Sequence, residues 1–168
     1  MLVKPLPKDS TEMMAAELIA GHGEAHLYAF SVDDSYKEVS VNMTTYEKGK
    51  VVEECKLFGY PFESETSKGL IAIVSDFSDH DVKVTVSQND GAGSVKFKIL
   101  DGVKNKELYS RAMSAGLEDE KVTKGEEKGL LCMVYDRDDS LAYSADAVIN
   151  GANIEENDYT YCFTVKFE

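Results

Sequence analysis

The chain has 168 residues, of which 43% are hydrophobic and 29% charged, and this balance is typical of one folded globular domain. Its 31 acidic and 18 basic residues give a formal net charge of −13. A surface of this charge repels phosphate backbones and anionic lipid headgroups, so neither nucleic acid nor a membrane surface is an expected partner. No apolar run approaches the length of about 20 residues that crosses a bilayer, and no transmembrane segment is predicted.

The start of the chain contains two prolines and shows no periodicity. This pattern predicts a tail or linker over residues 1–8, followed by a single β-rich domain over 9–168. Residues 9–12 resemble a capping box, and an apolar pattern follows them as far as Gly21, which together predict a short helix. A helix of about three turns has to pack against another element to be stable.

From Glu24 onward, apolar residues recur at every second position, which is the pattern of β-strands with one buried face. The stretches with this pattern, or with a continuous apolar run, are 27–32, 39–45, 51–57, 70–74, 82–86, 95–99, 130–135 and 159–167. Turns at 47–50 and 89–93 each join two of these stretches, and we expect both pairs to form hairpins. The run 70–74 is apolar throughout, which indicates a strand covered on both faces.

Three stretches give weaker patterns. Residues 103–116 suit either one face of a helix or a strand with a loop, and 141–149 fit either a strand or a helical turn. Residues 118–128 are almost entirely charged, so we expect a mobile loop there. Strands with one apolar face must pack against another layer, and helices do not alternate regularly with them. The sequence therefore predicts a mainly β, antiparallel β-sandwich-like single domain with one or two short helices.

The three cysteines, Cys55, Cys132 and Cys162, form no CxxC pair, so neither a zinc ribbon nor a thioredoxin motif is predicted. Cys55 and Cys132 fall on the apolar faces of their strands, and Cys162 falls on the polar face of its own. Cys55 and Cys132 could pair between two packed sheets, as in immunoglobulin-type sandwiches, although the chain has no tryptophan to pack against such a disulfide. Because free cysteines behave as small apolar residues, we expect buried free thiols.

A first candidate metal site lies just after the predicted helix. His22, Glu24 and His26 would share one face of an extended segment and could chelate Zn²⁺ or Ni²⁺. The spacing is not that of the HExxH motif, and Gly23 disfavours a helix that presents both histidines together. The alternative is a helix-to-strand turn whose polar residues are incidental.

A second candidate site would hold calcium, the one cofactor that the sequence suggests. Asp136, Asp138 and Asp139 resemble the opening of an EF-hand loop, since Ca²⁺ prefers several carboxylate and carbonyl oxygens. The match then ends, because Leu141 and Ala147 stand where that loop needs glycine and glutamate. A calcium site would need a loop from elsewhere in the chain to complete the three aspartates.

Polar residues also cluster between two predicted strands, over 75–80, where a Ser–His–Asp site could be imagined. A hydrogen-bonded turn explains the same residues, and the chain contains no GxSxG nucleophile elbow. The pair Gly91 and Gly93 lacks the third glycine and the following helix of a phosphate-binding loop. An enzyme would therefore need a hydrolytic or metal site assembled from distant residues, such as His22, His26, Asp79 and His80.

Nine tyrosines and no tryptophan bear on ligand binding. Tyr159 and Tyr161 lie on the apolar face of the last predicted strand and are interpreted as core residues. Tyrosines near turns and strand ends often cover a core edge while the hydroxyl stays in water, and one of them could anchor a ligand. The tyrosines in such positions are Tyr36, Tyr46, Tyr60, Tyr135 and Tyr143.

The leading hypothesis is a non-catalytic binding or interaction module with an unknown protein or small-molecule partner. Because the proline-containing start resembles a tether, we expect the extracytoplasmic part of a bacterial surface protein or lipoprotein, or a cytoplasmic protein if Met1 is the natural start. Two alternatives stay open. One is the hydrolase or metal-dependent enzyme described above, and the other is a calcium-stabilised structural domain.

Overall fold

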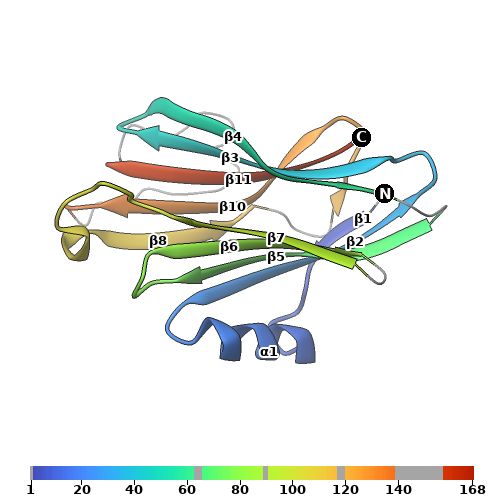
Figure 1. Cartoon of the computed structure of the whole chain (residues 1–168), viewed down its shortest axis with the longest axis horizontal. Helices are drawn as coiled ribbons and strands as arrows, with labels where there is room; N and C mark the ends of the chain where they lie inside the picture. The colour runs from blue at the N-terminus through green and yellow to red at the C-terminus, as the bar shows by residue number, and fades with distance from the viewer. Residues whose placement is uncertain (1, 63–65, 89–90, 117–119, 139–156) are drawn as a thin grey trace.

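The computed structural model of the chain describes residues 2–62, 66–88, 91–116, 120–138 and 157–168 (Figure 1). Two antiparallel sheets pack face to face, and a short helix lies against the outer face of one of them (Figure 1). The fold is therefore mainly β and sandwich-like, as the alternating apolar pattern predicts.

The six-stranded sheet has the strand order β7-β6-β5-β2-β1-β9, and every strand is antiparallel to its neighbours. Its strands are β1 (Leu2–Pro5), β2 (Glu24–Asp33), β5 (Thr66–Asp76), β6 (Asp81–Gln88), β7 (Gly91–Lys98) and β9 (Glu120–Lys121). The five-stranded sheet has the order β4-β3-β11-β10-β8 and is also antiparallel throughout. Its strands are β3 (Glu38–Glu47), β4 (Lys50–Pro61), β8 (Ser110–Ala115), β10 (Glu127–Asp136) and β11 (Tyr159–Phe167).

Both predicted hairpins are confirmed. β3 and β4 pair through a tight turn whose central residues, Lys48 and Gly49, have φ angles of 46° and 77°. Positive φ at both central positions is the geometry that matches the twist of a two-residue hairpin, and glycine adopts it without strain. β6 and β7 pair along their whole length, so that Gly91 and Gly93 lie in a strand rather than in the predicted turn.

The core lies between the sheets and is built from alternate side chains. Val82, Val84 and Val86 of β6 are completely buried, as their alternation with polar residues predicts. Phe163 and Phe167 of β11 are also completely buried and belong to the same core. Complete burial of such a side chain stabilises a fold by about 1.5–3 kcal/mol, so these alternating residues account for the packing of the two layers.

The prediction of a tail over residues 1–8 is wrong for residues 2–5. Leu2–Pro5 forms β1, which pairs with both β2 and β9, and Val3 is completely buried in the main core. The predicted mobile loop over 118–128 is wrong in a similar way. It contains β9 and the buried Val122, and its last residues already belong to β10. Both segments are ordered by strand pairing between parts of the chain that are distant in sequence.

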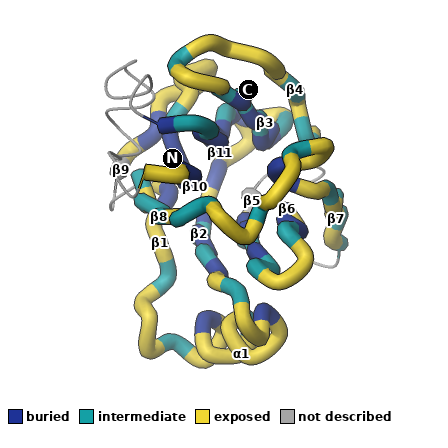
Figure 2. The backbone as a smooth tube through the Cα atoms, turned by 90° about the vertical axis from the view of Figure 1, so that its left-hand side faces the viewer, coloured by how far each residue is buried: buried dark blue, intermediate teal, exposed yellow. Residues whose placement is uncertain are grey.

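The predicted short helix is confirmed as α1 (Thr11–Ala20). The Ser10 hydroxyl accepts a hydrogen bond from the Met13 amide and caps its start, and Gly21, with φ of 62°, ends it. Met13 packs against Ala25 and Leu27 of β2, and the rest of the helix surface is largely exposed (Figure 2). Since α1 also contacts β5, the helix explains why the run 70–74 is apolar on both faces.

The structure describes one of the two stretches, 103–116 and 141–149, for which the sequence left two interpretations open. Residues 103–116 form a 3-10 helix (Lys106–Leu108) and then β8, so the strand-and-loop interpretation is the correct one. Residues 141–149 lie outside the described part of the chain. Within that part, no helix is long and apolar enough to span a membrane.

Candidate functional site

A cleft of about 880 Å³ opens between the two sheets at the end where the β3–β4 hairpin turns. We call it the inter-sheet cleft. One wall comes from β3, β4 and β11 of the five-stranded sheet, and the other comes from the end of β7 and the loop 99–104. Figure 1 shows the β3–β4 turn and this loop at the same end of the sandwich. Segments far apart in the sequence thus meet around one space.

The interior of the cleft is apolar. Met43, Leu57, Phe97 and Val103 line it, and all four also pack against or belong to the main core. The cleft is therefore an opening in the sandwich core rather than a shallow surface groove.

The β3–β4 pair is irregular beside the cleft. The register of the two strands shifts between Val41 and Asn42 and again between Thr45 and Tyr46. Bulges of this kind add twist and bend their strand. At the far end of β4 the sheets are in close contact, whereas Val52 at the hairpin end lines the cleft and is 55% exposed.

The close contact at the far end depends on glycine. A Cβ atom on Gly93 would lie 2.0 Å from the ring of Phe58, and one on Gly91 would lie 2.3 Å from the Tyr60 hydroxyl. Phe58 and Tyr60 stack on each other with ring centroids 6.0 Å apart. The two glycines let these β4 rings lie directly on the β7 backbone, which closes the sandwich beyond the cleft.

Three tyrosines line the cleft. The rings of Tyr109 and Tyr159 are tilted against each other with centroids 5.8 Å apart. Burial, followed by the nearby negative charge of Glu47, raises the pKa of Tyr159. Burial also raises the pKa of Tyr161 to about 12, and its hydroxyl accepts a hydrogen bond from the Leu100 amide at 2.8 Å. The Tyr159 and Tyr161 hydroxyls therefore stay neutral at physiological pH.

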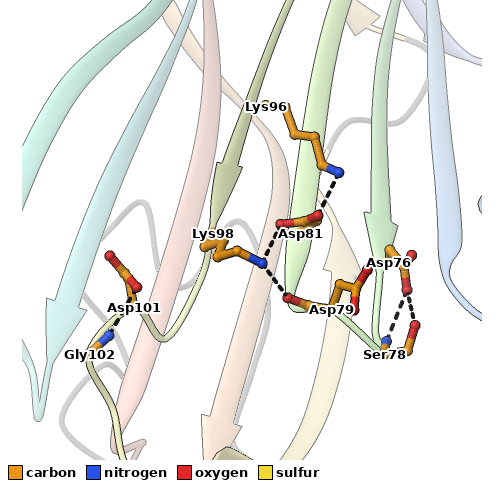
Figure 3. Close-up of polar contacts among 8 residues, drawn as sticks. All are labelled: Asp76, Ser78, Asp79, Asp81, Lys96, Lys98, Asp101 and Gly102. Carbon is orange, nitrogen blue, oxygen red and sulfur yellow. Dashed lines mark hydrogen bonds and ion pairs between the residues drawn. The ribbon is translucent and has the colours of Figure 1, made fainter.

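Charged side chains of both signs surround the opening. The Arg137 guanidinium lies 4.7 Å from the centroid of the Tyr109 ring and donates to the Lys104 carbonyl at 3.3 Å. Lys98 is engaged elsewhere, since its amine pairs with Asp81 and donates to the Asp79 carbonyl (Figure 3). The Lys104 amine lines the cleft and makes no hydrogen bond or ion pair with another described residue.

Two of the aspartates predicted to bind calcium, Asp136 and Asp138, lie at the end of β10 and just after it, beside the cleft. The Asp136 carboxylate accepts one hydrogen bond from the Asp138 amide at 2.7 Å and another from the Asp158 amide at 3.2 Å. Asp136 is buried, and these bonds hold the ends of β10 and β11 together. Asp139 lies outside the described residues, and among those described no three His, Cys, Asp or Glu residues are grouped so as to hold a metal ion.

The structure brings two of the residues in the proposed zinc or nickel site together. Glu24 and His26 lie in β2, and the His26 Nε2 is 3.5 Å from a Glu24 carboxylate oxygen. Burial lowers the pKa of His26, and the Glu24 charge opposes that shift. His22 precedes the strand and is exposed. His22 lies in the turn between α1 and β2, as the alternative interpretation of this segment predicts.

The Ser75–His80 segment forms a hydrogen-bonded turn between β5 and β6. The Asp76 carboxylate accepts from the amide of Ser78 at 3.0 Å and from its hydroxyl at 2.6 Å (Figure 3). Ser78 therefore contacts an aspartate but not His80. In the described part of the chain, no hydrogen bond or ion pair joins the four residues of the proposed distant enzyme site, which are His22, His26, Asp79 and His80.

Comparison of the chain with protein-family models, with curated proteins and with solved structures finds no match. Any indication of function therefore comes from the structure, in which the inter-sheet cleft is the main candidate site. The sequence alone does not predict this cleft. The strand pattern marks Tyr159 and Tyr161 only as core residues, and no motif includes Lys104 or Arg137.

Proposed function

We propose that the chain is a non-catalytic binding module that takes a small organic ligand in the inter-sheet cleft. The observation that supports this most is an 880 Å³ opening into the core that is walled by tyrosines. Ligand sites are commonly concave spaces of about 300–1,000 Å³ with an apolar lining and a few placed polar groups. The inter-sheet cleft has this size, and its lining combines apolar and tyrosine side chains with several charged ones, among them Glu53, Lys104 and Arg137.

The lining indicates the chemistry of the ligand. Met43, Leu57 and Phe97 favour an apolar body in the interior, and tyrosine rings beside them favour a flat one. At the opening, the Lys104 amine and the Glu53 carboxylate make no hydrogen bond or ion pair with other described residues. A molecule that carries an acidic and a basic or hydroxyl group on an apolar body would contact both.

Residues 2–5, which resembled a tether in the sequence, form a paired and partly buried strand. We therefore propose a binding role without a cellular location.

Thermal unfolding of the full chain against a ligand panel tests the proposal. The panel contains aromatic amino acids, short peptides, nucleosides, sugars and aromatic carboxylates, with EDTA present throughout. A ligand that binds only the folded protein at 100 times its Kd should stabilise it by about 2.7 kcal/mol. For a domain of this size, that corresponds to a rise in Tm of roughly 5–10 °C.

Two neighbouring valines provide a matched pair of variants. Val52 lines the cleft, whereas Val51 lies next to it on the other face of β4, and both are about half exposed, at 55% and 51%. We expect Val52→Arg to obstruct the opening and reduce the affinity for any ligand found by at least tenfold. Val51→Arg should leave the affinity unchanged. Equal affinities of the two variants would place the ligand elsewhere and overturn the proposal.

A further inference from the structure

Two of the three cysteines are direct neighbours in the five-stranded sheet. Cys132 of β10 and Cys162 of β11 are partners in the strand register, and both strands lie inside the sheet. Directly opposed residues of antiparallel strands have Cα atoms about 4.5–5.5 Å apart, which lies within the range of about 4.4–6.8 Å found in disulfides. The backbone therefore already holds this pair at bonding distance.

The side chains of the pair also meet. Cys132 and Cys162 are 0% and 3% exposed and belong to one small cluster with Val134 on the outer face of the sheet. A hydrogen bond with the Cys132 sulfur, followed by burial, raises the pKa of the Cys162 thiol. Cys162 lies on the face of β11 opposite the main core, as its alternation predicts, but that face is buried at this position.

Cys55 is excluded from the pair by its position. It lies on β4, on the opposite face of the same sheet, where it packs against the main core and lines the inter-sheet cleft. A disulfide between Cys55 and Cys132, which the sequence left open, is therefore excluded, because both residues belong to one sheet and face opposite ways. In the structure Cys132 and Cys162 are buried free thiols, as expected, and Cys55 is a half-buried one.

We propose that Cys132 and Cys162 are a disulfide-forming pair that is oxidised when the chain folds in the presence of a disulfide oxidant such as oxidised glutathione. One cysteine thiolate attacks a sulfur of the oxidant and releases one glutathione thiolate. The second cysteine then attacks the mixed disulfide and releases the other. The protein loses two thiol protons and two electrons, which reduce one glutathione disulfide to two glutathione thiols, while Cys55 keeps its thiol.

Burial of the two thiols determines when the disulfide can form. Only a thiolate attacks a disulfide, and a buried thiol with a raised pKa forms little thiolate. In the folded, reduced protein the pair is enclosed between two interior strands and reacts slowly. Before β10 and β11 pair, both thiols are accessible, so the oxidation state is determined during folding and is then retained.

The experiment starts from the full chain, unfolded and reduced. It is refolded once with glutathione and oxidised glutathione and once with reductant only, and free thiols are then alkylated under denaturing conditions. Intact mass counts the alkylated thiols, and a non-reducing peptide map identifies any linked peptides. We expect one alkylated thiol, at Cys55, after oxidative refolding, and three after reductive refolding.

The crosslink also has a thermal signature. It joins residues 30 positions apart, and constraint of the unfolded chain by a loop of this length should raise Tm by roughly 7–15 °C. Cys55→Ser is the matched control, in which the disulfide and the rise in Tm should persist. Three alkylated thiols after oxidative refolding of the unaltered chain, or a linked peptide that contains Cys55, would overturn the proposal. Because both readouts use the unaltered chain, they do not depend on the folding of a Cys132 or Cys162 variant.

Discussion

Replacement of Tyr161 by phenylalanine tests how the cleft wall is held. The Tyr161 hydroxyl accepts a hydrogen bond from the Leu100 amide, and Leu100 is only 1% exposed. Tyr161→Phe therefore leaves a buried N–H without an acceptor, which costs about 1–3 kcal/mol. Leu100 also has a φ of 53°, which is unfavourable for a branched residue, so this hydrogen bond holds a strained backbone in place.

For a domain of this size each kcal/mol lowers Tm by about 2–4 °C, so the variant should melt roughly 2–12 °C below the unaltered chain. Amide hydrogen exchange should show faster exchange at Leu100. Tyr36→Phe is the control, because Tyr36 is also buried but its hydroxyl makes no hydrogen bond within the described residues. If the two variants melt at the same temperature, the Leu100 contact does not stabilise the loop and the reasoning is refuted.

Two further perturbations test the interior of the sandwich. Gly93→Ala should destabilise the fold by about 1–3 kcal/mol in urea unfolding, because its Cβ would lie 2.0 Å from the Phe58 ring. Phe58→Leu should remove part of that cost in a double-mutant cycle, and strictly additive effects would contradict the contact. Burial lowers the pKa of His26 below its ordinary value of 6.5, so the unfolded chain binds more protons and stability falls as the pH drops below about 6.5. The pKa of His80 is shifted in the same direction, so His26→Gln should weaken the loss of stability between pH 7 and pH 5 without abolishing it, and an unchanged loss would exclude the role of His26.

Strands whose pattern is local could be predicted from the sequence. The alternation of Val82, Val84 and Val86 with polar residues defines a buried and an exposed face, whatever the strand pairs with. The same holds for β11. The turn at Lys48 and Gly49 was also readable, because a glycine in a short turn between two strands indicates a hairpin.

Strands that depend on distant partners could not be predicted. Leu2–Pro5 is too short to show a period, and its Pro5 suggests a linker, yet pairing with β2 and β9 makes it a strand and buries Val3. Val122 is similarly surrounded by charged residues in the sequence. Its burial follows from its place in the fold and not from its neighbours along the chain.

The candidate site could not be predicted either, because it also depends on contacts between distant parts of the chain. Its lining comes from β3, β4, β7 and β11, from the segment 101–109 and from Arg137, so no local motif marks it. The register shifts in the β3–β4 pair beside it leave no clear mark in an apolar alternation. Of the clusters that the sequence did mark, the Asp136 carboxylate accepts hydrogen bonds from two backbone amides. The His26 Nε2 lies 3.5 Å from a Glu24 carboxylate oxygen but makes no hydrogen bond within the described residues.

The way in which the loop 99–104 is anchored bears on how the cleft would bind. Three hydrogen bonds fix the loop by its backbone: the Ile99 amide donates to the His80 carbonyl, the Leu100 amide to Tyr161, and Arg137 to the Lys104 carbonyl. The two side chains come from β11 and from the end of β10, so the five-stranded sheet holds the opposite wall of the cleft at a set distance. A wall that is fixed before a ligand arrives does not have to be ordered on binding, which reduces the entropic cost of association. A preformed cleft of this kind suits the binding role that we propose.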